Sequence, residues 1–186
     1  MTCVIGLIED GTVYMGADRY SRGNDYSCSI LKKPKIFKKE NMLFGIAGYS
    51  RIADIIHYCF EIPERKADED TYHYLCNTFF KTLSKCMEEY GHMGDDEGAS
   101  GILEFRGTIL LGYEGELFEI GCGFEVIQNL KEYHTIGSGL FFASGAMEIL
   151  KDDKSLSPQQ KIKKALEVTS DLANEVAPPF DIIRLY

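Results

Sequence analysis

Short apolar runs separated by turn residues dominate the N-terminal part of the chain. The turns Glu9-Asp10-Gly11 and Lys39-Glu40-Asn41 each join two such runs, which predicts two hairpins. The segment between the hairpins, residues 18–34, is rich in Gly, Ser and Asn and reads as a loop. Because both faces of the first run are apolar, we expect that strand to be covered on both sides. The predicted strands span residues 2–8, 12–17, 35–37 and 42–47.

Helical spacing begins after the second hairpin. Ser50 can cap a helix whose apolar side chains recur as far as Phe60. A longer helix is predicted over residues 72–90, where apolar side chains hold helical spacing throughout. Close to the C-terminus, Ser157-Pro158-Gln159-Gln160 combines a cap residue, a first-turn proline and a capping-box glutamine. The apolar stripe of that last helix continues to Val176.

The remaining segments alternate between strand and helix patterns and complete the fold prediction. The order of elements is strands, two helices, strands, two helices, strand. Two stacked sheets with a helix pair on each outer face bury all of the apolar faces. We therefore predict an α+β fold, a four-layer αββα sandwich, built as a single domain over residues 1–186. The further strands are predicted at 101–105, 108–113, 116–120, 124–127, 133–136 and 180–185, with a helix at 140–150.

Composition and charge narrow the classes of partner. Hydrophobic residues make up 45% and charged residues 26% of the chain, as in ordinary globular proteins. The net charge is −9 and the only basic cluster runs from Lys32 to Lys39, so we expect no nucleic-acid partner. The start has no basic leader, and no apolar run is long enough for a bilayer. These features predict a cytoplasmic protein with no membrane partner.

Cysteine and histidine spacing gives no sign of a disulfide framework or a metal site. The six cysteines form no Cys-x-x-Cys pair, and most lie among apolar neighbours. Such cysteines are typical small buried side chains of a reducing compartment. The four histidines lack ligand spacing. We expect neither a metal nor a cofactor.

The first hairpin brings a carboxylate to the start of the chain. Folding the chain about Asp10 places Thr2 opposite Asp18 or Arg19, and cross-strand neighbours lie roughly 4.5–5.5 Å apart at Cβ. A single carboxylate at this position is better explained as a strand end that pairs with Arg19 or Arg22.

The chemistry of an N-terminal threonine makes this position more interesting. Initiator methionine is usually removed before a small residue, which would leave Thr2 first. A free α-amine has a pKa of roughly 7.7–8.0, so part of it is neutral at cellular pH and can accept a proton from the threonine hydroxyl. Nucleophile and base then come from one residue. Cys3 lacks this advantage, because its backbone nitrogen is never a free amine.

Six short motifs follow one another along the chain. They are Thr2-Cys3-Val4-Ile5-Gly6, Asp10-Gly11, Gly16-Ala17-Asp18-Arg19, Lys35-Ile36-Phe37, Gly45-Ile46-Ala47-Gly48 and Ile136-Gly137-Ser138-Gly139. In this order, and with a final helix and an apolar C-terminal strand after them, they resemble the proteasome β-subunits and the bacterial HslV-type peptidases. That family consists of N-terminal-nucleophile hydrolases with an αββα fold, and the resemblance spans nearly the whole chain.

The resemblance implies a role for each matched residue. Thr2 would be the nucleophile and, through its amine, the base. Asp18 would orient Lys35, which would tune the Thr2 hydroxyl. The N–H of Gly48 would contribute the oxyanion hole. Ser138 would hydrogen-bond the amine and a catalytic water.

Two features of the chain depart from the family pattern. Proteasome subunits usually carry an Asp and a Ser before a Gly-Gly pair after the last helix, where this chain has Glu175-Val176-Ala177-Pro178-Pro179-Phe180. Glu175 can replace the aspartate and, with Arg19, could support the site, but the serine has no substitute. The second feature is Met1, because its retention would convert the Thr2 amine into an amide with no base strength.

Three functions are compatible with these residues. The leading one is a threonine peptidase in a homo-oligomeric ring that degrades unfolded polypeptide. The chain has no Gly-x-x-x-x-Gly-Lys-Ser/Thr string, so an ATP-driven unfoldase would be a separate partner. The alternatives are a non-catalytic ring subunit that keeps Met1 and an N-terminal-nucleophile amidase that acts on a small amide. The specificity pocket would be lined by the loop after Asp18 and the segment after Gly48.

Overall fold

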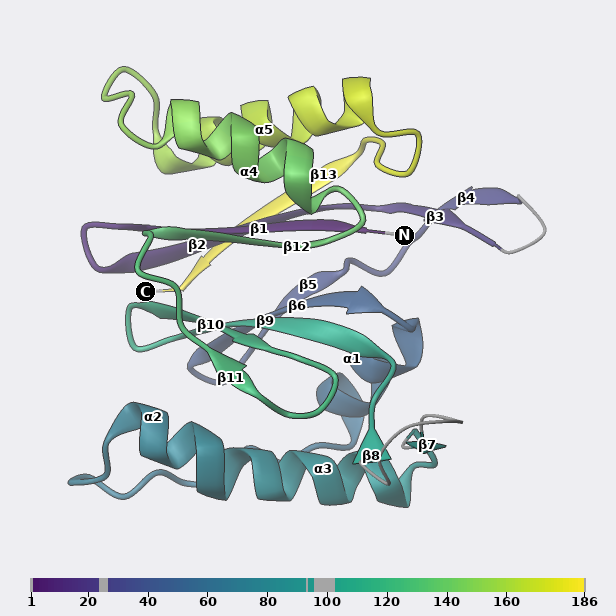
Figure 1. Ribbon diagram of the computed structural model, residues 1–186, viewed down its shortest axis with the longest axis vertical. Coiled ribbons are helices and arrows are strands. Elements are labelled where there is room, and N and C mark those ends of the chain that lie inside the picture. Colours follow the sequence, from purple (N-terminus) through teal and green to yellow (C-terminus); the bar gives the residue numbers. More distant parts are fainter. Residues whose placement is uncertain (1, 24–26, 93, 96–102, 186) are drawn as a thin grey trace.

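Four layers make up the computed structural model, which describes residues 2–23, 27–92, 94–95 and 103–185. Two antiparallel sheets pack face to face in the middle, and helices cover the outer face of each (Figure 1). Helices α4 (Leu140–Leu150) and α5 (Pro158–Leu172) lie on one sheet, and α1 (Ser50–Tyr58), α2 (Thr71–Tyr74) and α3 (Phe80–Glu89) lie on the other. The predicted αββα sandwich is therefore confirmed. Within the described ranges, no helix is long and apolar enough to cross a bilayer.

The first sheet carries the start of the chain in an interior strand. Val4 pairs with Ala17 in the first hairpin, which is one of the two registers predicted for it. Cys3, Ile5 and Leu7 face helices α4 and α5, whereas Val4 faces the other sheet, so the first strand is covered on both sides as expected. The strands, in spatial order, are β12 (Tyr133–Gly137), β1 (Cys3–Glu9), β2 (Thr12–Asp18) and β13 (Phe180–Leu185).

The second sheet contains the second predicted hairpin. Its turn includes Glu40 at φ 52°, and Phe37 pairs with Phe44 across it. Strand β6 is an interior strand, between β5 and β9, and it ends at Gly48. The strands, in spatial order, are β11 (Val126–Ile127), β10 (Glu116–Ile120), β9 (Gly107–Tyr113), β6 (Met42–Gly48) and β5 (Ile36–Lys39).

The helices on the second sheet differ from the prediction in two details. Ser50 is the first helical residue, and Tyr49 occupies the cap position without a side-chain hydrogen bond, so the predicted cap is wrong. The long predicted helix contains a π-helical turn, in which a wider backbone spacing shifts the buried face by one residue. The elements are α1 (Ser50–Tyr58), α2 (Thr71–Tyr74), the π-turn η1 (Leu75–Phe79) and α3 (Phe80–Glu89).

The helices on the first sheet are α4 (Leu140–Leu150) and α5 (Pro158–Leu172). The predicted capping box of α5 is confirmed, because Ser157 and Gln160 each accept a hydrogen bond from the other's backbone N–H. Helix α5 ends at Leu172, whereas the apolar stripe of the predicted helix continues to Val176. Val176 is nevertheless buried against the same apolar cluster.

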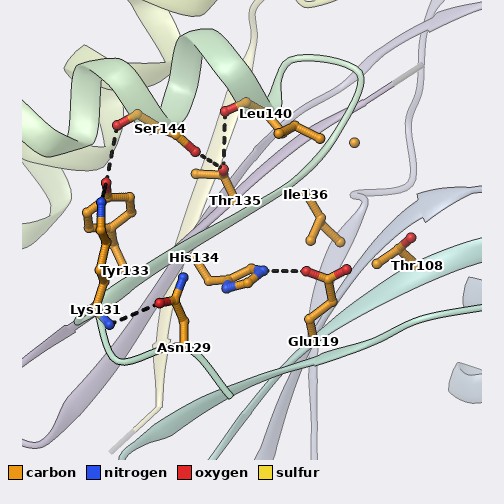
Figure 2. A pocket seen from close by; sticks show the side chains of 11 residues that line it. Thr108, Glu119, Asn129, Lys131, Tyr133, His134, Thr135, Ile136, Leu140 and Ser144 are labelled. Carbon is orange, nitrogen blue, oxygen red and sulfur yellow. Dashed lines mark hydrogen bonds and ion pairs between the residues drawn. The ribbon is translucent and has the colours of Figure 1, made fainter. Parts of the chain in front are cut away.

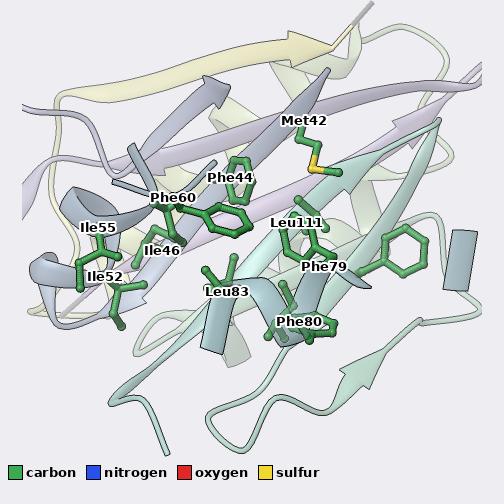
Figure 3. Packing of buried hydrophobic residues seen from close by; sticks show 14 of the residues in the cluster. Met42, Phe44, Ile46, Ile52, Ile55, Phe60, Phe79, Phe80, Leu83 and Leu111 are labelled. Carbon is green, nitrogen blue, oxygen red and sulfur yellow. The ribbon is translucent and has the colours of Figure 1, made fainter. Parts of the chain in front are cut away.

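Three apolar clusters hold the layers together, one between each adjacent pair of layers. The largest lies between the second sheet and helices α1, α2 and α3, where Phe44, Phe60 and Phe79 are in ring contact (Figure 3). Burial of large aromatic side chains contributes heavily to folding free energy. The sandwich is therefore a rigid support for the segments at its edge.

Two small hairpins lie outside the main sheets and revise the sequence prediction. The segment predicted as a loop, residues 18–34, contains a hairpin of β3 (Tyr20–Arg22) and β4 (Cys28–Ile30), in which Tyr20 pairs with Ile30. Strands β7 (Gly94–Asp95) and β8 (Leu103–Glu104) form the other. Part of the strand predicted at 101–105 lies outside the described residues. The strand predicted at 124–127 is shorter and begins at Val126.

Candidate active site

Thr2 lies just before strand β1, and the loop after β12 holds its backbone. The Thr2 N–H donates to Ser138 Oγ at 3.2 Å, and the Thr2 carbonyl accepts from Ser138 Oγ and from the Gly139 N–H, each at 3.3 Å. Gly137 has φ +92°, and a Cβ there would lie 2.3 Å from the Thr2 carbonyl oxygen. Only glycine fits at this position, so the Gly-Ser-Gly string fixes the threonine from one side.

Asp18 ties the ends of both hairpins together. It is fully buried at the end of β2, opposite Cys3, whose N–H donates to Asp18 Oδ1 at 2.9 Å. Asp18 Oδ2 accepts from the Tyr20 N–H at 3.0 Å and from Lys35 Nζ at 2.8 Å. A buried carboxylate is stable only with such partners. The first hairpin therefore delivers a fixed negative charge beside the chain start.

Lys35 is the buried cation that this carboxylate holds. Its exposed fraction is 8%, and its Nζ also donates to the carbonyl of Tyr20 at 2.5 Å. Burial lowers the pKa of Lys35, and the charge of Asp18 works in the opposite direction. The amine is fixed in direction by two acceptors, which suits a group that acts on its surroundings through its charge.

Gly48 ends strand β6 in a conformation that favours glycine. Its φ is +115°, and a Cβ would lie 2.6 Å from Gly107 Cα and 2.7 Å from the carbonyl oxygen of Arg106. The neighbouring strand β9 thus approaches too closely for any side chain. The sequence Gly45-Ile46-Ala47-Gly48 therefore turns sharply out of the sheet at its last residue.

One cavity of about 240 Å³ brings three of the predicted site residues together, whereas Asp18 and Ser138 are not among its lining residues. Thr2, Lys35 and Gly48 all line it. Leu31, Ile46 and Ala53 give the cavity apolar walls. Its polar lining residues are Ser21, Ser50 and the ion pair between Lys33 and Asp54. Part of its lining comes from the loop after Asp18 and the segment after Gly48, and the role of these segments as a specificity pocket stays a prediction. Sequence reasoning missed the Lys33–Asp54 pair, because its members lie on different elements and no motif joins them.

Arg19 and Glu175 do not line this cavity. The guanidinium of Arg19 forms a bidentate pair with Asp181 of β13, at 2.6 and 2.7 Å, and donates to the carbonyl of Lys32 at 2.8 Å. It thus joins the sheet edge to the segment before Lys35. Glu175 is half-buried in the turn after α5. Their supporting roles in catalysis stay predictions.

A second, polar cavity of about 350 Å³ lies between strands β12, β9 and β10, and Gly137 lines it (Figure 2). Its side chains pair with one another. His134 Nε2 contacts Glu119, and Thr135 Oγ1 contacts Ser144 Oγ at 2.5 Å and donates to the Leu140 carbonyl at 3.2 Å. These pairs join strand β12 to its neighbours, so they brace the strand that leads into Ser138. No cluster of three metal-ligating side chains occurs among the described residues.

No protein-family model matches the chain. Solved structures, in contrast, superpose on it over nearly its whole length. BPH from Thiobacillus denitrificans, solved in complex with epoxomicin, superposes with a TM-score of 0.79 at 17% identity, over 98% of this chain and 97% of BPH. The chain has the fold of the proteasome-like N-terminal-nucleophile hydrolases. Eukaryotic HslV from Trypanosoma brucei gives 0.68 at 18% identity, over 98% of both chains. Anbu (ancestral beta-subunit) from Yersinia bercovieri gives 0.65 at 14%, over 98% of this chain and 81% of Anbu.

The proteasome-like fold confirms the resemblance read from the motifs at the level of the fold. It accounts for the convergence of segments far apart in sequence, since the two hairpins and the Gly-Ser-Gly loop meet at one edge of the sandwich. The roles assigned to Thr2, Asp18, Lys35, Gly48 and Ser138 stay predictions at these identities. Met1, on which the chemistry depends, lies outside the described residues.

Cys3 is the other nucleophilic side chain beside Thr2, and its surroundings exclude it from that role. Burial, and next the negative charge of Asp18, raise the pKa of Cys3 to about 12. At pH 8 only about one thiol in 10⁴ would then be ionised, and the thiolate is the reactive form.

We therefore expect Cys3 to resist alkylation in the native protein. Treatment with iodoacetamide at pH 8 should modify the exposed Cys28 and Cys76, whereas Cys3 should react only after denaturation in urea. Mass spectrometry of proteolytic peptides measures each site separately. Modification of Cys3 at the rate of Cys28 would contradict its burial and its high pKa.

Proposed function

We propose that this chain is a threonine peptidase of the proteasome and HslV kind. In this proposal Thr2 becomes the first residue when Met1 is removed, and it hydrolyses peptide bonds. The observation that carries the proposal is the shared cavity of Thr2, Lys35 and Gly48, with the fully buried Asp18 held against Lys35 at 2.8 Å. A structural role alone does not require a buried lysine at the edge of an open cavity.

The first half of the reaction forms an acyl-enzyme. The Thr2 hydroxyl attacks the carbonyl carbon of the scissile peptide, and its proton passes to the Thr2 amine, directly or through a water held by Ser138. The oxyanion that forms accepts a hydrogen bond from the Gly48 N–H. The carbon–nitrogen bond then breaks, and the leaving amine takes the proton from the Thr2 ammonium. The acyl group remains on Thr2 as an ester.

The second half of the reaction hydrolyses the ester and regenerates the free enzyme. A water attacks the ester carbon, and the neutral Thr2 amine accepts one of its protons. The ester bond breaks, the threonine oxygen regains a proton from the ammonium, and the carboxylic acid product leaves. The positive charge of Lys35 lowers the pKa values of the Thr2 hydroxyl and amine in both halves, and so keeps the amine neutral at cellular pH.

The setting of this reaction follows from the same proposal. We place the protein in the cytoplasm as a homo-oligomeric ring that encloses its active sites. Its substrate is unfolded polypeptide, which a separate ATP-dependent unfoldase would deliver. The apolar walls formed by Leu31, Ile46 and Ala53 suit an apolar side chain next to the scissile bond.

The bond between Met1 and Thr2 offers a direct test. The chain is expressed with an N-terminal tag that a specific protease removes immediately before Thr2, and the same preparation is assayed before and after cleavage. We expect hydrolysis of a fluorescently labelled unfolded protein only after cleavage, because only then is the amine a base. Intact mass shows which residue comes first.

Epoxomicin gives a second measurement on the same samples, since BPH has been solved in complex with it. We expect the cleaved protein to bind epoxomicin and lose activity, and the tagged protein to do neither. Equal inactivity of both forms would favour the non-catalytic ring subunit. Hydrolysis of small amides without any cleavage of polypeptide would favour the amidase instead.

A further inference from the structure

Two arginines, Arg51 and Arg106, lie near the predicted oxyanion glycine, Gly48, without a carboxylate to balance their charge. Both residues are exposed, and neither forms an ion pair within the part of the chain that the structure describes. Arg19 and Arg65, in contrast, each pair with an acidic side chain. Acidic partners are plentiful in a protein with a net charge of −9. The two unpaired guanidinium groups therefore point to an anion supplied by another molecule.

The backbone places both arginines at the edge of the candidate active-site cavity. The Tyr49 N–H donates to the Arg106 carbonyl at 3.2 Å, and a Cβ on Gly48 would lie 2.7 Å from the same carbonyl oxygen. Arg51 is the second residue of α1, and Ser50 before it lines the cavity together with Gly48. The start of α1 and the turn into β9 thus bring the two side chains to one rim.

His92, which follows α3, completes this group. Its ring packs edge-on against the ring of Tyr49, with centroids 6.1 Å apart, and its Nε2 is buried without a hydrogen-bond partner among the described residues. Burial, and next the charges of Arg51 and Arg106, lower the pKa of His92. The imidazole is therefore neutral at pH 7, and both guanidinium groups act on it. We call Arg51, His92 and Arg106 the basic rim.

The position of Arg51 is unfavourable for the helix that carries it. A cation in the first turn meets the positive end of the helix dipole. Helix α1 has no acidic residue in its first turn and no side-chain cap that would offset this charge. The stability of the fold therefore does not account for Arg51, whereas a bound anion does.

We propose that the basic rim binds an acidic side chain of the polypeptide substrate and so directs cleavage to peptide bonds near an Asp or a Glu. This inference rests on the proposed peptidase function, because Arg51 is the residue directly after Ser50 in the cavity lining. An extended chain advances about 3.3–3.6 Å per residue, so the acidic residue lies within about three residues of the cleaved bond. A guanidinium group pairs with a carboxylate through two parallel hydrogen bonds, and the imidazole of His92 can donate one more.

Matched peptides test the preference. Each pair differs by a single Glu-to-Gln exchange at one of the three residues on either side of the cleaved bond, which mass spectrometry identifies. For an exchange at one particular position, chains that begin at Thr2 should show at least about tenfold higher kcat/KM on the Glu peptide. Added salt, at about 0.5 M, should reduce this ratio. Equal ratios at every position would overturn the proposal.

Substitution of both arginines tests whether the rim is the source. The Arg51→Gln and Arg106→Gln chain should cleave the Glu and Gln peptides equally, and should cleave the Gln peptide at the wild-type rate. The matched control is Arg184→Gln, which removes an exposed arginine of β13 outside the rim and should keep the preference. Thermal unfolding of Arg51→Gln should be at or above wild type, because the helix loses an unfavourable charge. A preference for Glu that survives in the double variant would rule out the rim.

Binding to a chain that cannot cleave separates this proposal from the peptidase function. The Thr2→Ala chain should bind the Glu peptide at least about tenfold more tightly than the Gln peptide in fluorescence anisotropy. The Glu peptide should also raise the pKa of His92 in an NMR titration, because its carboxylate offsets the charges of Arg51 and Arg106. The His92→Gln chain assigns the signal. Equal binding of the two peptides would contradict the proposal, whereas selective binding without turnover by the wild-type chain would support the rim and count against the peptidase function alone.

Discussion

Replacement of Thr2 by alanine is expected to abolish peptide hydrolysis while the fold persists. The substitution removes the only hydroxyl that the proposed mechanism uses as nucleophile, and it leaves the α-amine in place. Loss of a nucleophile of this kind lowers kcat by about 10⁴-fold or more. The measurement is turnover of a labelled unfolded protein by chains whose intact mass shows that residue 2 comes first.

Thr2→Ser is the matched control for this prediction. Serine keeps the hydroxyl and, like alanine, is small enough for removal of the initiator methionine. We expect it to retain measurable activity, although loss of the methyl group leaves the hydroxyl less constrained. Thermal unfolding should be close to wild type for both variants, since serine lacks only the methyl group of Thr2 and alanine lacks only its methyl group and hydroxyl, at a site at the sheet end. Full activity of Thr2→Ala would exclude Thr2 as the nucleophile.

The placement of Asp18 could be predicted from local rules. A tight turn at Asp10-Gly11 leaves only two registers, and either brings the end of β2 beside the start of β1. The observed register puts Cys3 opposite Asp18, and the carboxylate accepts from the Cys3 N–H. Hairpins are short-range structures, so their geometry follows from the residues between their strands. The same holds for the capping box of α5.

Contacts between distant segments could not be predicted from such rules. Lys35 and Ser138 were assigned through the family resemblance, because no local pattern joins them to Thr2. The pairing of Arg19 with Asp181 depends on the order of strands in the sheet, which the sequence leaves open. The π-turn at 75–79 is equally hidden, because apolar residues keep helical spacing on both sides of it. Packing across layers decides these features.

Asp18→Asn carries the largest expected effect on stability. Asparagine keeps the size of the side chain but removes the charge that holds Lys35, whose side chain is only 7% exposed. An uncompensated buried charge costs about 3–5 kcal/mol of unfolding free energy. We expect denaturant unfolding to show a loss of this order at pH 7, together with loss of peptidase activity.

The pH dependence of this loss identifies Lys35 as its source. Burial already lowers the pKa of Lys35 from its ordinary value of 10.5, and removal of Asp18 takes away the main opposing influence. The folded variant then binds fewer protons than the unfolded chain between the lowered pKa and 10.5, so its stability rises with pH in that window. The deficit relative to wild type should therefore shrink as pH rises toward 10.5. A deficit independent of pH would point to the backbone hydrogen bonds of Asp18 instead.

A double substitution separates the structural role of this pair from its catalytic role. In the Asp18→Asn and Lys35→Met chain no charge is left unpaired, and methionine fills the space of the lysine stem. We expect the double variant to regain most of the stability that Asp18→Asn loses, and to remain inactive, because no positive charge then lowers the pKa of the Thr2 amine and hydroxyl. Recovery of activity together with stability would show that Lys35 serves only to fill the site. Stable but inactive protein is the result that a charge acting on Thr2 requires.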